Sequence, residues 1–381
     1  MSSTTPYLPL GQFIRPIDER NRDGLVTNLL GVSFNKGFIP SVANTIGTDM
    51  SKYKVVRKGQ FACSLMQVGR DKLLPVALYE RDDEALLSSA YVVFDINDTN
   101  KLHPEYLRLC VVRKEFDRQA TFLSGHGVRA NLPWEDFCSI TIPVPPITEQ
   151  TRIVSQFTTL EKRISLCKAR ISLLERTASA LYRKTFVDGI DRNNLPDGWR
   201  MGTLEEVANL IVAGTIPIYD DSSNKLVLGQ KCIHDHRVDL IPARRHTPKA
   251  SCLYLQAGDI LINSTGDGTL GRVAQYWGVD KELAFDSNMT LLRPLNDDEA
   301  YYLGQLLVSL EEYFVRISQG STNQTRLYCS MVRATEVILP SDATVWEYAI
   351  QMRPIQKSIN NKYLQLSCLE RTKKLLLTQI K

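Results

Sequence analysis

Apolar residues recur at alternating spacings of four and three positions in two long stretches of the chain. Such spacing is typical of the seam along which amphipathic helices pack in a coiled coil. The first seam consists of Ile153, Phe157, Leu160, Ile164, Cys167, Ile171, Leu174, Ala178, Leu181 and Thr185. This pattern predicts a long helix over residues 148–187.

An internal repeat locates the second seam. The tetrapeptide Leu-Glu-Arg-Thr occurs at 174–177 and again at 369–372, a shift of 369 − 174 = 195 positions. The same shift gives a second seam of Tyr348, Met352, Ile355, Ile359, Lys362, Leu366, Leu369, Lys373, Leu376 and Ile380. The aliphatic stems of its two lysines can cover a seam while the ammonium groups reach water. We therefore expect a second helix over 342–381. Because each seam needs a partner, the two helices should form an antiparallel coiled coil.

The ends of both predicted helices carry sequence signals. Pro145-Pro146 stops the preceding strand, and Thr148 is a candidate N-cap for the first helix. Asp342 is the candidate N-cap of the second helix, in which Pro354 predicts a kink or a later start. No run of about 18 apolar residues occurs, so no membrane span is expected.

The segments before the two helices are also repeated. Residues 140–145 (ITIPVP) match 335–340 (TEVILP) at the same shift, and both segments alternate Gly/Asp/Asn-rich turns with short β-branched runs. A helical stretch is expected in each, near 103–119 and 297–317. The fold class is therefore α+β, with two strand-rich domains in tandem, each followed by a long helix, and with pseudo-twofold symmetry.

The repeat also predicts the domain boundaries. Residues 188–196 (DGIDRNNLP) are polar and rich in turn formers, which indicates a linker. The resulting division is a first recognition domain over 1–147, a first helix over 148–187, a linker over 188–196, a second recognition domain over 197–341 and a second helix over 342–381.

Two polar loops occur at matching places in each domain. Loops that bind DNA need polar side chains for base edges, with Lys or Arg nearby for phosphates. The candidate DNA-binding residues of the first domain are Ser64, Gln67, Arg70, Ser124, His126, Arg129 and Asn131. Those of the second domain are Ser264, Thr265, Gln319, Ser321, Thr322, Asn323, Gln324 and Arg326. The alternative is that these are surface turns, and the two arginines at 129 and 326 could bind guanine, phosphate or a carboxylate.

Composition indicates a cellular compartment but does not identify a binding partner. The formal net charge of +4 permits nucleic-acid binding but does not require it. Eight cysteines without a C-x-x-C pair fit reduced thiols in the cytoplasm better than disulfides. The first residues lack the charged and apolar regions of a secretory signal.

Several kinds of catalytic centre are not supported by the sequence. The chain has neither an Asn/Asp-Pro-Pro-aromatic tetrapeptide for methylating a flipped base nor a phosphate-binding G-x-x-x-x-G-K-[ST] loop. Residues 266–271 match G-x-G-x-x-G, but a strand is expected after them, which favours a turn over a dinucleotide site. The only Cys/His cluster comprises Cys232, His234, His236, His246 and Cys252. Its spacing matches no common zinc finger, so a solvated or phosphate-facing loop is favoured over a metal site.

These features together resemble the specificity subunit of type I restriction-modification systems. Residues 195–199 (LPDGW) with 204–207 (LEEV) are similar to the family's opening of a recognition domain, and 212–217 (VAGTIP) to its Gly-Thr-Pro turn. Residues 142–150 (IPVPPITEQ) are similar to the start of its first conserved helix. The first domain lacks the Pro-x-Gly-Trp opening, and the second helix lacks the Pro-Pro-x-x-Glu-Gln start.

The resemblance implies a non-catalytic subunit that reads one half of a bipartite, asymmetric target in double-stranded DNA with each domain. The helices would fix the gap and dock two modification (methyltransferase) subunits and the restriction subunits. S-adenosylmethionine, Mg and ATP would be bound by those partners, and the chain itself would carry no cofactor or metal. The alternatives are a specificity subunit for a related enzyme that cuts beside its site, a coiled-coil scaffold that binds proteins, and a metal enzyme using the Cys/His cluster.

Overall fold

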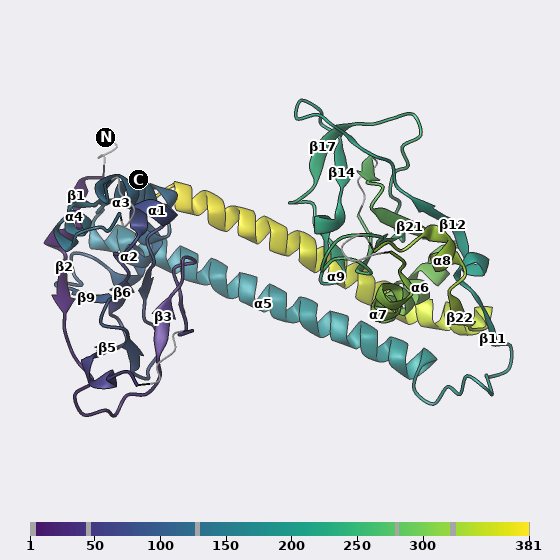
Figure 1. Ribbon diagram of the computed structural model, residues 1–381, viewed down its shortest axis with the longest axis horizontal. Coiled ribbons are helices and arrows are strands. Elements are labelled where there is room, and N and C mark those ends of the chain that lie inside the picture. Colours follow the sequence, from purple (N-terminus) through teal and green to yellow (C-terminus); the bar gives the residue numbers. More distant parts are fainter. Residues whose placement is uncertain (1–4, 43–46, 126–129, 279–281, 321–324, 381) are drawn as a thin grey trace. The chain divides into compact units, whose positions relative to one another are not determined.

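The computed structural model describes residues 5–42, 47–125, 130–278, 282–320 and 325–380. The chain divides into two compact units (Figure 1). The first unit contains residues 1–166 and 367–381, and the second contains 167–366. Each unit therefore holds one strand-rich domain together with parts of both long helices, and the α+β class predicted from the repeat is confirmed. In the described part of the chain, no helix is both long and apolar enough to cross a membrane.

The long helices are α5 (Ile147–Phe186) and α9 (Asp342–Thr378). None of the seam positions identified in the sequence is exposed; each is buried or half-buried. In the first unit, the Lys373 ammonium lies 2.7 Å from the Glu161 carboxylate. In the second unit, the Tyr363 hydroxyl donates to Glu175 Oε1 at 2.5 Å. Early residues of α5 thus meet late residues of α9 and the reverse, so the helices pack antiparallel.

Neither long helix is capped by the residue that the sequence predicted. The first helix starts at Ile147, because the Pro146 carbonyl already accepts from the backbone N–H groups of the next turn, so Thr148 is not its N-cap. The second starts at Asp342, but the cap is Ser341, whose hydroxyl accepts from the Thr344 N–H at 3.3 Å. α9 continues through Pro354, so a later start is excluded.

In its described residues, the first domain has ten short strands and four helices besides α5. Its strands are β1 (Tyr7–Pro9), β2 (Ile14–Ile17), β3 (Leu30–Val32), β4 (Phe38–Pro40), β5 (Lys54–Val56), β6 (Phe61–Cys63), β7 (Val76–Leu78), β8 (Ala85–Leu87), β9 (Val92–Ile96) and β10 (Thr141–Pro143). Its helices are α1 (Val68–Asp71), α2 (Pro104–Val111), α3 (Lys114–Leu123) and α4 (Trp134–Ser139), with 3-10 turns at Leu10–Gln12 and Met50–Lys52. The main sheet has the antiparallel order β2-β9-β6-β7, and β1 pairs with β10.

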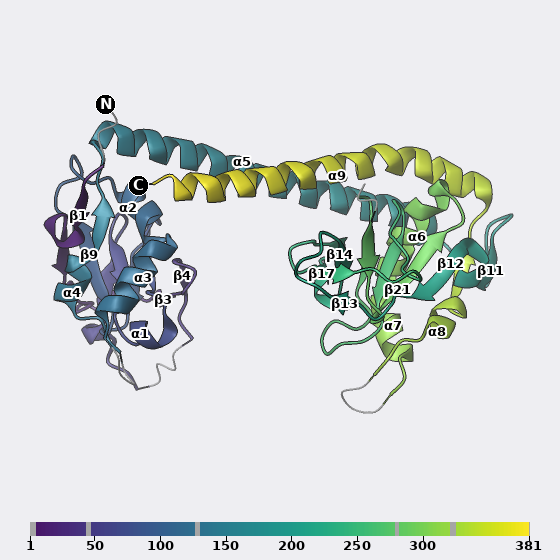
Figure 2. The same ribbon diagram turned by 90° about the horizontal axis from the view of Figure 1, so that it is seen from above.

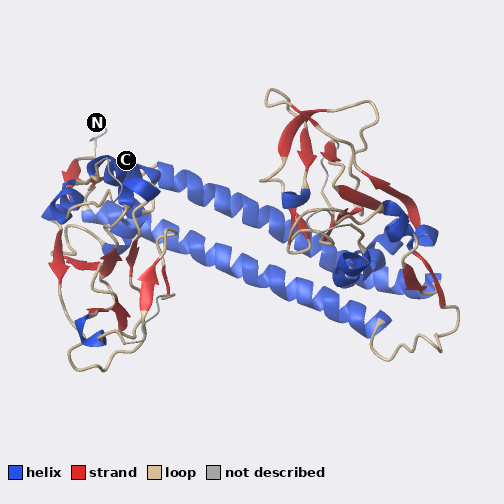
Figure 3. Cartoon of the chain, in the orientation of Figure 1, coloured by secondary structure: helices blue, strands red, loops and turns tan. Residues whose placement is uncertain are grey.

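Twelve strands and three helices besides α9 lie in the described part of the second domain. Its strands are β11 (Arg200–Thr203), β12 (Ala208–Ala213), β13 (Ile218–Tyr219), β14 (Leu226–Leu228), β15 (Ile233–His234), β16 (Arg237–Val238), β17 (Arg244–Thr247), β18 (Ile260–Asn263), β19 (Val273–Gln275), β20 (Leu283–Phe285), β21 (Met289–Pro294) and β22 (Glu336–Leu339). Its helices are α6 (Asp297–Ser309), α7 (Glu311–Ile317) and α8 (Cys329–Arg333), with 3-10 turns at Leu204–Val207 and Gln230–Cys232. Figure 3 shows these strands in red.

The internal repeat of the sequence reappears in the topology of the two domains. The main sheet of the second domain has the order β12-β21-β18-β19, which matches β2-β9-β6-β7 strand for strand, and β11 pairs with β22 as β1 pairs with β10. A buried tyrosine is repeated as well. Tyr106 donates to the Pro143 carbonyl at 3.1 Å, and Tyr302 donates to the Ile338 carbonyl at 2.6 Å. Each bond ties the helix after the main sheet to the strand before the long helix.

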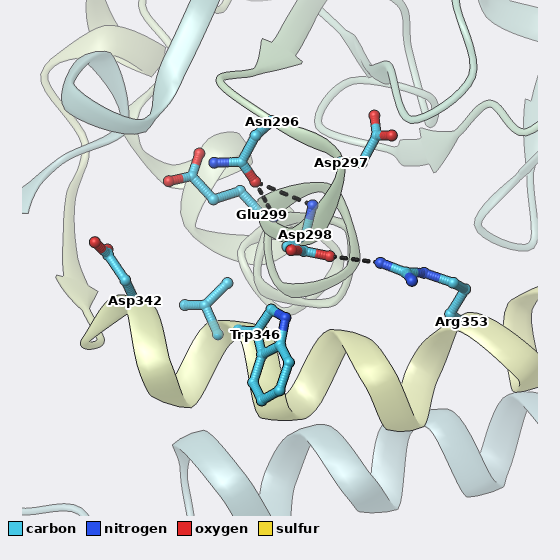
Figure 4. A pocket seen from close by; sticks show the side chains of 8 residues that line it. Asn296, Asp297, Asp298, Glu299, Asp342, Trp346 and Arg353 are labelled. Atoms are coloured by element: carbon cyan, nitrogen blue, oxygen red, sulfur yellow. Dashed lines mark hydrogen bonds and ion pairs between the residues drawn. The ribbon is translucent and has the colours of Figure 1, made fainter.

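The start of each long helix meets its domain in a different way. Gln150 is fully buried; its amide accepts from the His103 N–H and donates to the carbonyls of Lys101 and Pro145, all at 2.8–2.9 Å. At the repeat shift, 345 − 150 = 195, the second half has Val345. An open pocket of about 700 Å³ lies at this place (Figure 4), and its lining residues are Asn296, Asp297, Asp298, Glu299, Asp342, Val345, Trp346 and Arg353. The first unit therefore has three hydrogen bonds from a buried glutamine at this place, called the Gln150 clamp below, where the second unit has a pocket lined by acidic residues.

Replacing Gln150 by alanine should destabilise the first unit, because one buried and two partly buried backbone groups lose their partners. Each unsatisfied group costs roughly 1–3 kcal/mol, so we expect a loss of about 3 kcal/mol in the free energy of unfolding. Chemical denaturation of the full chain measures this, with Gln156→Ala, an exposed glutamine on the same helix, as the control. Equal stability of the two variants would contradict the Gln150 clamp.

Candidate nucleic-acid interface

In the first domain, the two candidate loops of the sequence lie side by side. The early loop, residues 64–70, follows β6. The late loop, residues 124–131, follows α3. The Gln67 N–H donates to Asn131 Oδ1 at 3.0 Å, and the Leu132 N–H donates to the Leu65 carbonyl at 2.8 Å. Figure 2 shows α1, which continues the early loop, at the end of the domain away from α5. The two loops therefore form one polar surface.

Gly69 permits the close approach of these loops. Its N–H donates to the Ala130 carbonyl at 3.1 Å. A Cβ atom at this position would lie 2.6 Å from both Ala130 Cβ and Ser124 Oγ, which is closer than carbon atoms can approach. Any larger residue would push the loops apart.

A buried ion pair supports the same loops from beneath. The Lys36 ammonium contacts Asp117 Oδ1 at 2.6 Å and also donates to the Leu74 carbonyl, while the Leu74 N–H donates to Asp117 Oδ1 at 3.0 Å. The side chains of Lys36 and Asp117 are only 6% and 13% exposed. Burial lowers the pKa of Lys36, and Asp117 partly offsets this effect. The pair joins the β3–β4 hairpin to α3 and to the end of the early loop.

The corresponding loops of the second domain are also joined. The Leu327 N–H donates to the Ser264 carbonyl at 2.8 Å. The late loop is closed at its base by reciprocal backbone bonds of 3.0 and 2.8 Å between Gln319 and Arg326. The Arg326 guanidinium donates to the Ser287 carbonyl at 3.0 Å, which ties this loop to the turn before β21. The same two loops thus meet in both domains.

Three further polar residues of the second domain form a chain of hydrogen bonds with Thr265 of the early loop. The Gln230 amide donates to Thr265 Oγ1, and this hydroxyl donates to Asn288 Oδ1 at 3.1 Å. The Asn288 N–H donates to Asp286 Oδ1 at 2.8 Å, and burial raises the pKa of Asp286. Sequence reasoning missed these residues because they come from turns far from the candidate loops. Their common signal is a glycine or aspartate turn directly after a strand.

The candidate DNA-binding residues differ in accessibility. The exposed ones are Gln67, Arg70, Asn131 and Gln319, and the half-buried ones are Ser64, Thr265 and Arg326. Two hydroxyls point inward: Ser124 donates to the Thr121 carbonyl, and Ser264 lies 2.6 Å from Thr290 Oγ1. The remaining candidates, His126, Arg129, Ser321, Thr322, Asn323 and Gln324, lie outside the described residues.

The Cys/His cluster of the second domain is split among separate contacts. His234 lies 3.0 Å from Asp239, and His236 lies 3.4 Å from Glu311, whose carboxylate raises the pKa of this histidine. Within the described ranges, no group of three or more His, Cys, Asp or Glu side chains could hold a metal ion. After the G-x-G-x-x-G segment comes strand β19, so that segment is a turn, as expected.

The geometry can be set beside proteins of known family. Residues 76–176 match the family described as "Type I restriction modification DNA specificity domain". The chain is 25% identical over 171 residues to the type I restriction enzyme HindI specificity subunit of Haemophilus influenzae. That alignment covers 43% of this chain and 36% of the relative, so the chain matches about a third of that protein's length.

Solved structures extend the likeness to the fold of the whole chain. The S subunit of a type I restriction-modification system from M. genitalium matches with a TM-score of 0.65 at 14% identity, covering 100% of this chain and 97% of that one. The HsdS subunit from Thermoanaerobacter tengcongensis matches with a TM-score of 0.39 at 20% identity, covering 100% and 97%. The first match establishes that the two proteins share their fold.

Replacing Asp117 by alanine should destabilise the first domain by about 3 kcal/mol, because it leaves the Lys36 ammonium buried without a counter-ion. Chemical denaturation measures the loss, and Glu115→Ala, an exposed carboxylate on the same helix, is the control.

The pH dependence distinguishes this cause from a simple packing defect. Without Asp117, the pKa of Lys36 in the folded chain falls further below its ordinary value of 10.5, so the unfolded chain binds more protons. The stability of the variant should therefore rise with pH up to about that value. A loss that does not change with pH would refute the buried ammonium as its cause.

Proposed function

We propose that this chain is a specificity subunit of a type I restriction-modification system and that it reads a bipartite, asymmetric DNA target with one domain on each half-site. Specificity subunits of this family are non-catalytic, so the chain would supply sequence recognition to enzymes that act on the DNA. In this proposal, the joined early and late loops of each domain form the base-reading surface.

The observation that carries the proposal is that both domains bring the same two loops together but place different polar side chains on them. The first domain offers Gln67 and Arg70, and the second offers Gln319 and Arg326 beside the amide of Gln230. Amide groups pair bidentately with adenine and guanidinium groups with guanine. Two domains with the same loop arrangement but different loop side chains are suited to two half-sites of different sequence.

Some candidate residues are better suited to holding the loops than to reading bases. The hydroxyls of Ser124 and Ser264 are buried and hydrogen-bonded within the domain. Gly69 and the Lys36–Asp117 pair act in the same way in the first domain. We assign these residues to positioning, so their replacement should alter folding of the loops before it alters the choice of base.

The long helices suit the role of spacer. The 40 residues of α5 correspond to a length of about 60 Å at 1.5 Å per residue. Half-sites read from one face of DNA are separated by about 34 Å for each helical turn. A helix of this length is stiff enough to fix such a gap.

We further propose that the helices dock two modification subunits and that restriction subunits join through them. S-adenosylmethionine, Mg and ATP would be bound by those partners. The described cysteines are all free thiols, which is consistent with a cytoplasmic location.

The direct test is to determine methylated bases genome-wide in a host that carries the gene and in one that lacks it. Loss of one gapped, two-part motif on deletion is expected. An unchanged methylome, with the modification subunits expressed and active, would contradict the proposal and favour a protein-binding scaffold.

Half-specific variants test the assignment of one domain to each half-site. Arg70→Ala should relax or abolish recognition of one half of the motif, and Gln319→Ala should affect the other half only. Methylation of the relaxed motifs reports both effects, with Gln156→Ala on α5 as the control. If one variant altered both halves, the division of labour would be wrong.

A further inference from the structure

The second domain has an exposed sheet edge beside its main sheet, formed by strands β13 and β17 and called the ribbon below; β17 also pairs on its other side with β14, where Arg244 lies opposite Val227. Strands β13 and β17 pair antiparallel, with Ile218 opposite Thr247 and Tyr219 opposite His246. They belong to a separate sheet of order β13-β17-β14-β20, in which β13 is an edge strand. Neither candidate loop includes any part of this ribbon, which therefore has no role in the function proposed so far.

The ribbon carries a preorganised arginine. The Arg244 guanidinium carbon lies 3.4 Å from the centre of the Tyr219 ring, which is a close cation–π stack. Both side chains are exposed, Tyr219 to 46%. Among the described residues, no carboxylate lies within ion-pair distance of Arg244 or of its exposed neighbour Arg245. Stacking leaves the in-plane N–H donors of Arg244 facing outward and reduces the entropy lost when it binds.

Two exposed isoleucines precede Tyr219 in the chain. Ile216 and Ile218 are 69% and 52% exposed, although a folded chain usually buries isoleucine. Such a combination of arginine, tyrosine and exposed isoleucine marks a recognition surface rather than a solvated face. The nearest acidic side chain along the strand, Asp220, is engaged by the hydroxyl of Thr247 at 2.8 Å.

The ribbon is built directly onto the reading loops of the same domain. The chain enters it through Gly214, where a Cβ atom would lie 2.3 Å from the Asp286 carbonyl oxygen, so the backbones are in close contact. Thr215 forms a bridge with Asp286. On the other side, Gln230 follows β14 and donates to Thr265 of the early loop. Bonds at both ends therefore connect the ribbon to the Asp286–Asn288 turn and to the early loop.

We propose that the β13–β17 ribbon is a second DNA-contacting element of the second domain, with Arg244 as its recognition residue. This inference rests on the proposed function. A guanidinium binds paired oxygen or nitrogen acceptors bidentately. The acceptors are either O6 and N7 of a guanine or two phosphate oxygens. Ile216 and Ile218 suit apolar contact with thymine methyl groups or sugars.

DNA is favoured over a protein partner because the two exposed arginines lack carboxylate partners within the described part of the domain. An apolar protein surface that matches the isoleucines would remove water from both guanidinium groups without offering them an acceptor. DNA offers acceptors on its bases and phosphates.

The experiment co-expresses the full chain with the modification subunits of its host and determines the methylated motif genome-wide. The affinity of the purified complex for a duplex carrying that motif is then measured at several salt concentrations. The variants are Arg244→Ala, Arg244→Lys and Tyr219→Ala. Tyr219→Phe, which keeps the stacking ring, should behave as the unchanged protein. Arg192→Ala, an exposed arginine of the linker, is the control, and thermal unfolding of each variant reports its folding.

If Arg244 reads guanine, Arg244→Ala relaxes one position in one half-site and lowers affinity for the motif roughly 5- to 150-fold. If it binds phosphate, affinity falls for all sequences and the salt dependence becomes shallower by about one unit of slope. Unchanged motif and affinity would overturn the inference, as would loss of co-purifying modification subunits with DNA affinity intact. A wild-type complex that leaves no bipartite motif would instead refute the proposed function itself.

Discussion

The shared burial of the long helices and the domains is the constraint on which the rest of the structure depends. In the second unit, the Phe186 ring at the end of α5 lies 4.6 Å from Tyr302 and 4.8 Å from Tyr348 on α9. In the first unit, Phe157 and Ile380 are each 2% exposed within the core of the first domain. A helix of this length gains most of its stability from such packing and little from propensity. Each domain and its helix segments must therefore fold together.

This shared core explains how loops whose side chains differ between the two domains can have a defined position. The tyrosine bonds from α2 and α6 join these helices to β10 and β22, the strands that precede the long helices. Close backbone contacts then hold the loops to each other, as at Gly69 in the first domain. The polar side chains consequently sit on a rigid base without contributing to the core themselves.

The sequence predicted those features that depend on local periodicity or on the repeat. The seam, the antiparallel pairing, the two strand-rich domains and the paired loops all followed from spacings within the chain. The N-caps were assigned to the wrong residues: Thr148 lies inside α5, and Ser341 rather than Asp342 caps α9. Lys36 and Asp117 escaped notice because 81 positions separate them and only the tertiary register of hairpin and helix brings them together. The ribbon escaped notice because β13 is two residues long and carries no period.

The two halves of the chain share some buried contacts and differ in others. Tyr106 and Tyr302 make the same bond because a buried hydroxyl without an acceptor is expensive, and the fold offers one carbonyl at that place in each half. At the start of the long helices, the requirement is weaker. Gln150 satisfies three backbone groups in the first half, whereas in the second half Asn296 caps α6 with bonds of 3.0 Å and the space beside Val345 stays open to solvent. Replacing a loop side chain that faces water costs the least free energy of folding. A chain built in this way can change what it reads without changing what holds it together.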